Sequence, residues 1–261
     1  PNEETWLDET DLVFIDPVGT GYSRAAKKEL LAKFASRTGD IESVGEFIRM
    51  YLTRHKRWLS PLFLVGESYG TTRAAGLAGY LVDKGIAFNG IALVSTILNF
   101  QTARFTSGND LPYPLILPTY TATAHYHKRL PANLQRRPLR ELLREVEKWA
   151  LGPYSEALAK GDALPAAERK AVAAQLAAYT GLEARYVEQG ELRIALPYFN
   201  RALQRENNQL VGRLDSRLTG PGPRSLEATY EFDPSMSAIR PPYTAAFNHY
   251  VRAELEFESD L

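Results

Sequence analysis

The most constraining feature of this 261-residue sequence is an apolar run that leads directly into a serine between two glycines. Residues 62–70 read Leu-Phe-Leu-Val-Gly-Glu-Ser-Tyr-Gly, and a segment rich in alanine and glycine follows. A strand, a G-x-S-x-G turn and a helix in this order are typical of a nucleophile elbow, which exposes the serine on a sharp turn. Side chains at Gly66 or Gly70 would crowd that turn. The pattern therefore predicts Ser68 as a catalytic nucleophile.

Chance is the alternative explanation for this motif. With ordinary glycine and serine usage, G-x-S-x-G alone occurs in roughly one chain in ten of this length. Requiring the strand before it and the helix after it lowers this to about one in a hundred. Catalysis is therefore favoured over an ordinary turn.

The helix behind Ser68 predicts half of an oxyanion hole. A helix N-terminus offers N–H groups and the positive end of the helix dipole to a developing negative charge. The backbone N–H of Tyr69 is the expected donor.

The first hundred residues alternate strand and helix patterns. Short β-branched or aromatic runs, typical of buried strands, lie at residues 12–15, 62–65 and 91–94. Helices are expected between them, at about 40–52 with Asp40 as the N-cap and at about 69–84 with Gly85 as the stop. Strand, helix, strand, helix, strand indicates a parallel sheet with flanking helices. The predicted class is α/β.

The pattern changes after about residue 105, where strand runs vanish and helical spacing dominates. Helical segments are expected at 139–159, 165–179, 182–189 and 194–205, and a terminal helix started by prolines at 241–257. Three parts follow: residues 1–105 as an α/β core that carries the elbow, 106–218 as a mainly helical insertion, and 219–261 as a loop and a terminal helix that returns toward the core.

Composition excludes several function classes. Lys and Arg (31) balance Asp and Glu (31), so no general attraction to nucleic acid is expected. No cysteine is present, which removes disulfides, thiolate metal sites and a cysteine nucleophile. We expect no metal, no cofactor, no membrane-spanning segment and no signal peptide at the start. The oligomeric state is not indicated.

A second glycine loop lies upstream, at residues 16–23, after the run at 12–15. Loops at strand ends are common ligand sites. A dinucleotide-binding G-x-G-x-x-G motif fails here, because Arg24 stands at the third glycine position.

These two motifs resemble the serine carboxypeptidases, peptidase family S10, of the α/β-hydrolase fold. Residues 66–70 match the family's G-E-S-Y-G signature, and residues 16–23 are similar to its strand-terminating glycine loop. Thr71 and Arg73 depart from the pattern, since many members carry glycine and an aromatic residue there. The resemblance implies a partial α/β-hydrolase fold with the helical region as a cap insertion over the active site.

The resemblance also implies roles for the elbow residues. Ser68 would be acylated by a peptide substrate, the Tyr69 N–H would bind the oxyanion, and Glu67 would bind the substrate's C-terminal carboxylate. Two acids can bind one another only when they share a proton, so activity is expected to favour acidic pH. The resemblance implies a periplasmic or secreted protein, because the family is mainly secreted, periplasmic or vacuolar. The absence of cysteine fits a bacterial periplasmic member better than a disulfide-bonded eukaryotic one.

A complete triad is not evident in the sequence. This fold places the acid and the histidine on loops after late strands. The histidines here are His55, His125, His127 and His249, and none follows a predicted strand. The family's second acid and its N-G-G-P-G oxyanion loop are also not found. A triad of Ser68, Asp233 and His249 would complete the site from within this sequence, but it is the less favoured interpretation.

The favoured interpretation is a fragment of a carboxypeptidase that is inactive alone, because Ser68 lacks its base. Two alternatives stay open. An acyltransferase or esterase of the same fold would resolve acyl-Ser68 with another nucleophile, and a non-catalytic binding module would not use Ser68 chemically.

Overall fold

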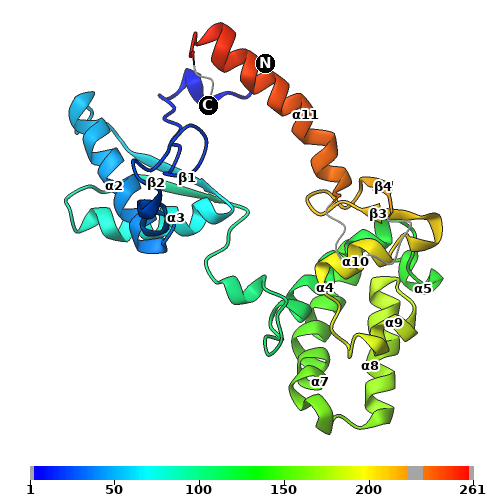
Figure 1. Ribbon diagram of the computed structural model, residues 1–261. Coiled ribbons are helices and arrows are strands. Elements are labelled where there is room, and N and C mark those ends of the chain that lie inside the picture. Colours follow the sequence, from blue (N-terminus) through cyan, green and yellow to red (C-terminus); the bar gives the residue numbers. More distant parts are fainter. Residues whose placement is uncertain (1–2, 223–231, 259–261) are drawn as a thin grey trace. The chain divides into compact units, whose positions relative to one another are not determined.

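The computed structural model describes residues 3–222 and 232–258, which include every predicted site residue (Figure 1). The chain divides after Asn99 into two compact units, each described here by itself.

The first unit is a small α/β body. Strands β1 (Phe63–Glu67) and β2 (Gly90–Val94) pair in parallel, in register from Phe63 opposite Gly90 to Glu67 opposite Val94. Helix α3 (Tyr69–Val82) connects them, and α2 (Arg37–Arg54) and the short α1 (Leu31–Phe34) precede β1. Their buried apolar core consists of Val44, Leu52, Leu77, Leu81 and Ile86. The two strands and the α/β class of this part are confirmed.

The strands themselves are less buried than predicted. Phe63 and Val65 on β1 are 64% and 53% exposed, and Ile91 and Val94 on β2 are also exposed. Leu62 and Leu64 pack against the helical core. Among the described residues this sheet has two strands, too few to enclose both of its faces.

The strand predicted at residues 12–15 is wrong. Residues 11–17 have no helix or strand structure, and Phe14 is 89% exposed. A β-branched run becomes a strand only where a neighbouring strand accepts its backbone hydrogen bonds. In the described part of the chain β1 and β2 pair only with each other in their sheet.

The N-cap assignment of Asp40 is also wrong. Helix α2 begins at Arg37, and the Ser36 hydroxyl caps it by accepting from the Gly39 N–H at 3.1 Å. Asp40 lies inside the first turn and is buried. Serine and aspartate are both strong N-caps, so residue type alone did not discriminate between them.

The second unit is mainly helical. Its helices are α4 (Pro112–Tyr126), α5 (Ala132–Gln135), α6 (Leu139–Trp149), α7 (Ser155–Lys160), α8 (Ala166–Thr180), α9 (Ala184–Gln189), α10 (Leu196–Ala202) and α11 (Pro234–His249). A π-helical turn, Ala150–Tyr154, joins α6 to α7. A continuous apolar core runs from α4 to α10, with Tyr120 stacked on Phe199 at a centroid distance of 4.0 Å. The four predicted internal helices are confirmed.

Two details of this unit correct the sequence predictions. Residues 219–221 were expected in a loop, yet β3 (Gln209–Val211) and β4 (Thr219–Pro221) form an antiparallel pair. The terminal helix begins at Pro234 and contains Pro241 and Pro242 in its interior. Asp233 starts it, because its carboxylate accepts from the Ser235 N–H at 2.9 Å. The prolines at 241 and 242 were therefore the wrong start signal.

Across residues 3–222 and 232–258, no helix combines the length and the apolar character needed to cross a bilayer.

Candidate active site

Ser68 sits at the junction between the last residue of β1 and the first residue of α3. Its backbone has φ 53° and ψ −121°, which is neither a strand nor a helix conformation. Residues other than glycine rarely adopt a positive φ, because this conformation strains the backbone. Backbone strain of this kind concentrates at functional sites. The serine is exposed. The strand, turn and helix predicted for the elbow are all present.

The two elbow glycines are not equivalent. A Cβ on Gly66 would lie 2.2 Å from the carbonyl oxygen of Gly70, so only glycine fits at position 66. A Cβ on Gly70 would meet no described atom within 4 Å. The steric prediction is right for Gly66 and wrong for Gly70.

Tyr69 opens the 14-residue helix α3, so its backbone N–H lies at the positive end of the helix dipole. Its side chain turns toward α2. Burial, and next the nearby Asp40 carboxylate, raise the pKa of the Tyr69 phenol, while Arg73 acts in the opposite direction. The Arg73 guanidinium lies 5.3 Å from the centre of the Tyr69 ring.

Asp40 and Arg73 form an ion pair that joins the first turn of α2 to the second turn of α3. The Arg73 Nε–H donates to both carboxylate oxygens of Asp40, at 2.8 and 3.1 Å. Their side chains are 7% and 22% exposed for Asp40 and Arg73 respectively. The pair therefore holds the start of α3, one turn beyond Ser68, against α2. Sequence reasoning did not find this contact.

Glu67 ends β1, directly before the nucleophile, and is exposed. Its carboxylate makes no hydrogen bond or ion pair with any residue that the structure describes. This leaves it accessible to an external group.

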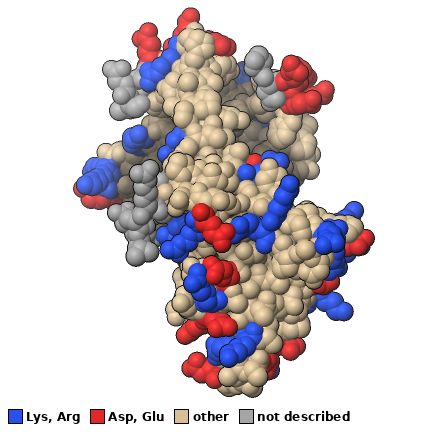
Figure 2. Space-filling view, turned by 90° about the vertical axis from the view of Figure 1, so that its right-hand side faces the viewer, with Lys and Arg blue, Asp and Glu red and all other residues tan. Residues whose placement is uncertain are grey.

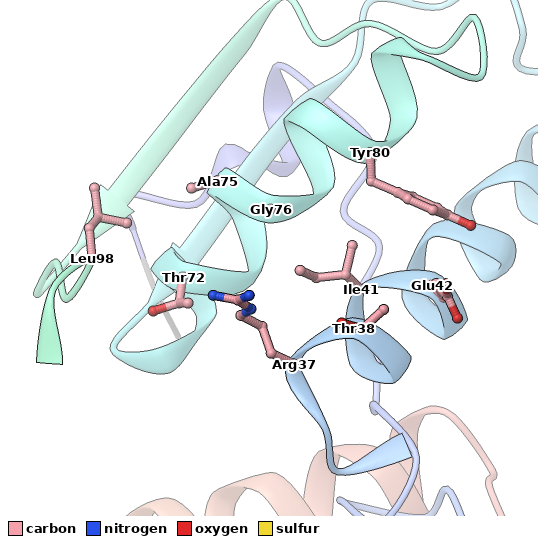
Figure 3. Close-up of a pocket in the computed structure, with 9 residues that line it drawn as sticks. All are labelled: Arg37, Thr38, Ile41, Glu42, Thr72, Ala75, Gly76, Tyr80 and Leu98. Atoms are coloured by element: carbon pink, nitrogen blue, oxygen red, sulfur yellow. The ribbon is translucent and has the colours of Figure 1, made fainter. Parts of the chain in front are cut away.

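A groove of about 540 Å³ lies beside the elbow, between α2 and α3 (Figure 3). Arg37 on α2 points across one end of it toward Thr72, and Tyr80 and Glu42 mark the other end (Figure 3). The described residues that line it do not include Ser68. The groove is therefore not the cleft in which Ser68 would react.

The upstream glycine loop folds around one carboxylate. Asp16 accepts a hydrogen bond from the Tyr22 N–H at 2.8 Å. Gly21 has φ 47°, and a Cβ there would lie 2.1 Å from that carboxylate. Arg24 donates to the carbonyls of Gly21 and Ser23 at 2.7 and 2.9 Å. Arg24, which stands where a dinucleotide-binding motif would need glycine, thus holds this loop together.

The histidines do not assemble a triad. In the first unit, His55 caps the C-terminus of α2, and its ring packs in a tilted arrangement against Tyr51 at a centroid distance of 4.3 Å. The ion pair between Asp40 and Arg73, which lies next to the elbow, is near the other end of this 18-residue helix. The helix is about 27 Å long at 1.5 Å per residue. His55 is therefore remote from the elbow.

Asp233 and His249 cannot orient one another. They lie at opposite ends of α11, which at 1.5 Å per residue separates them by about 24 Å. Asp233 is engaged as the helix cap and accepts from Ser235 and Arg213. The internal triad of Ser68, Asp233 and His249 is therefore excluded.

The remaining two histidines, His125 and His127, lie at the C-terminal end of α4. His127 caps α4, and its Nε2 lies 2.7 Å from the Ser216 carbonyl oxygen. His125 precedes it near the end of the same helix. Within the described ranges, no three His, Asp or Glu side chains gather as metal ligands would.

Comparison with known proteins shows what the segment around this elbow is similar to. Residues 1–114 match the family model described as serine carboxypeptidase, and they include both glycine motifs. Over these residues the chain is similar to the serine carboxypeptidases. The match ends inside α4, so it covers the α/β unit and little of the helical one.

Curated relatives from Arabidopsis thaliana agree with the family match. Serine carboxypeptidase-like 15 is 34% identical over 67 residues, and serine carboxypeptidase-like 17 is 38% identical over 66. Serine carboxypeptidase-like 51 is 33% identical over 87 residues. These alignments cover 24–32% of this chain and only 15–18% of each relative's length. No solved structure matches the chain significantly.

The glycine geometry yields one prediction. Gly66→Ala is expected to destabilise the first unit by at least about 3 kcal/mol, because its methyl group would overlap a backbone carbonyl. Gly79→Ala, in the open middle of α3, is expected to stabilise it by about 1 kcal/mol. Hydrogen exchange of the β1 and α3 amides measures both. Equal protection in the two variants would contradict the steric argument.

A second prediction concerns the ion pair. Arg73→Met leaves the buried Asp40 carboxylate unpaired and is expected to cost about 3 kcal/mol of unfolding free energy. Arg49→Met, which breaks the exposed pair with Glu46 on the same α2 helix, is expected to cost far less, because solvent screens that pair. The measurement is urea unfolding at neutral pH. A cost for Arg73→Met no larger than that for Arg49→Met would show that the ion pair between Asp40 and Arg73 does not stabilise the fold.

Proposed function

We propose that this chain is the nucleophile-bearing part of a serine carboxypeptidase that releases C-terminal residues from peptides through an acyl-Ser68 intermediate. The observation that carries the proposal is the strained Ser68 backbone at a strand-to-helix turn, within the segment that matches the family. A residue held in this conformation directly before a helix N-terminus is suited to nucleophilic attack.

In the proposed reaction the Ser68 Oγ attacks the carbonyl carbon of the last peptide bond while a general base takes its proton. The carbonyl oxygen becomes an oxyanion beside the Tyr69 N–H and the positive end of α3. Collapse expels the C-terminal amino acid, whose amine takes the proton from the base. Water then adds to the acyl-serine and releases the shortened peptide and free Ser68.

Glu67 is proposed to bind the substrate's C-terminal carboxylate. It is adjacent to Ser68 along the chain, exposed at the carboxyl end of β1, and unengaged by other described residues. A carboxyl group can hold a carboxylate when the two share one proton. This arrangement selects substrates with a free C-terminus.

The general base and its acid partner are proposed to come from residues outside these 261. The support is that His55 is remote from the elbow, that Asp233 and His249 are separated along α11, and that the alignments cover under a fifth of each relative. The helical unit is proposed as the cap over the active site. Acidic and basic side chains are interspersed over the face shown in Figure 2, which fits a peptide partner better than nucleic acid.

The nucleophile assignment is tested with a fluorophosphonate probe and intact-mass analysis. The isolated chain is expected to show little or no labelling and no peptidase turnover, because Ser68 lacks its base. A longer form that carries the base is expected to gain one adduct on Ser68, and none with Ser68→Ala. Absence of an adduct in the longer form would overturn the proposal. Rapid labelling of the isolated chain at Ser68 would instead place the base within these 261 residues.

The role of Glu67 predicts a pH dependence. In a form of the protein that turns peptides over, kcat/KM is expected to fall as rising pH removes the proton shared by the two carboxyl groups. Glu67→Gln keeps a donor at every pH and is expected to flatten this profile. The matched control is Glu42→Gln on α2, where the profile should keep its shape. A Glu67→Gln profile identical to that of the unmodified protein would refute carboxylate binding by Glu67.

A further inference from the structure

Thr71 lies in the first turn of α3, three residues after the candidate nucleophile, and its side chain is fully buried. Its hydroxyl donates to the carbonyl oxygen of Ser68 at 2.7 Å and accepts from the backbone N–H of Ile97 at 2.9 Å. One buried hydroxyl thus bridges the elbow and the loop that follows β2.

The loop after β2 is fixed to the same helical turn by a second threonine. The Thr72 hydroxyl donates to the carbonyl oxygen of Ile97 at 2.5 Å. Both backbone polar groups of Ile97 are therefore bound by consecutive side chains of α3. This gives the Thr71 hydroxyl a well-anchored partner on the side away from Ser68.

The backbone of Ser68 is held on both sides. Its N–H donates to the carbonyl oxygen of Val94 at 3.0 Å, and its own carbonyl accepts from the Thr71 N–H at 3.0 Å as well as from the Thr71 hydroxyl. A strained backbone conformation persists only where surrounding contacts determine it. The hydroxyl of Thr71 supplies the side-chain contact in this set.

The carbonyl of Ser68 and the N–H of Tyr69 belong to one peptide unit. Because that unit is planar and trans, its C=O and N–H point in opposite directions, and fixing one fixes the other. We infer that Thr71 is a positioning residue, whose hydroxyl holds the Ser68 carbonyl and thereby aims the Tyr69 N–H at the oxyanion. This role rests on the proposed function of the Tyr69 N–H.

The hydroxyl of Thr71 makes both contacts, so this chain holds its elbow with a side chain. Because the site is fully buried, removing the hydroxyl also leaves the Ile97 N–H without its acceptor.

The test compares Thr71→Val, which keeps the shape and loses the hydroxyl, with Thr71→Ser, which keeps the hydroxyl. The readouts on the 261-residue chain are the ¹³C shift of the Ser68 carbonyl and the ¹⁵N and ¹H shifts of the Tyr69 amide. Thr71→Val is expected to move all three, and Thr71→Ser to restore them. Thr180→Val is the control, since Thr180 is equally buried and donates to the Leu176 carbonyl at 2.7 Å in the other unit.

The inference is overturned if folded Thr71→Val keeps the Ser68 and Tyr69 signals at their original positions, or if Thr71→Ser moves them as far as Thr71→Val does. Should Thr71→Val not fold, Thr71→Ala takes its place with the same criteria. These signals report the peptide orientation whether or not Ser68 reacts. Failure of the positioning role is therefore distinguishable from failure of the proposed function, which the probe labelling tests separately.

Discussion

The left-handed φ of Ser68 is the constraint on which the arrangement of the first unit depends. An L-residue keeps this conformation only when neighbouring contacts oppose its relaxation. Here the missing side chain of Gly66 makes room for the turn, and Val94 and Thr71 bind the serine backbone from two sides. The parallel pairing of β1 with β2 is what brings Val94 to that position.

The elbow could be predicted from sequence because its determinants are local. A strand, two glycines, a serine and a helix start all lie within a dozen consecutive residues, and each has a backbone requirement that residue types reveal. The contacts that stabilise the elbow were not predictable in this way. Asp40 and Arg73 are 33 residues apart, and Thr71 and Ile97 are 26 apart. The available signal for the Asp40–Arg73 pair was one charged residue on each of two helices that were expected to cover the same sheet. Aspartate is also a preferred helix cap, however, and this gave Asp40 another explanation.

The failed predictions share a physical cause. The run at residues 12–15 has strand-forming residues, but strand structure requires a partner that supplies backbone hydrogen bonds. The terminal helix has prolines at 241 and 242 that would suit a first turn, yet the Asp233 carboxylate and Pro234 begin the helix earlier. The short pair of β3 and β4 has no alternating pattern to reveal it. In each case a partner or a cap outside the local window decided the outcome.

The uncovered strands of the first unit affect how this chain is handled in solution. Phe63, Val65, Ile91 and Val94 present apolar side chains on a sheet of two described strands, whose outer edges carry backbone groups able to pair with another chain. Edge strands of this kind are templates for intermolecular sheets. Purification at low concentration, and a companion segment that adds a strand beside β1 or β2, are the physical means of keeping such a surface monomeric.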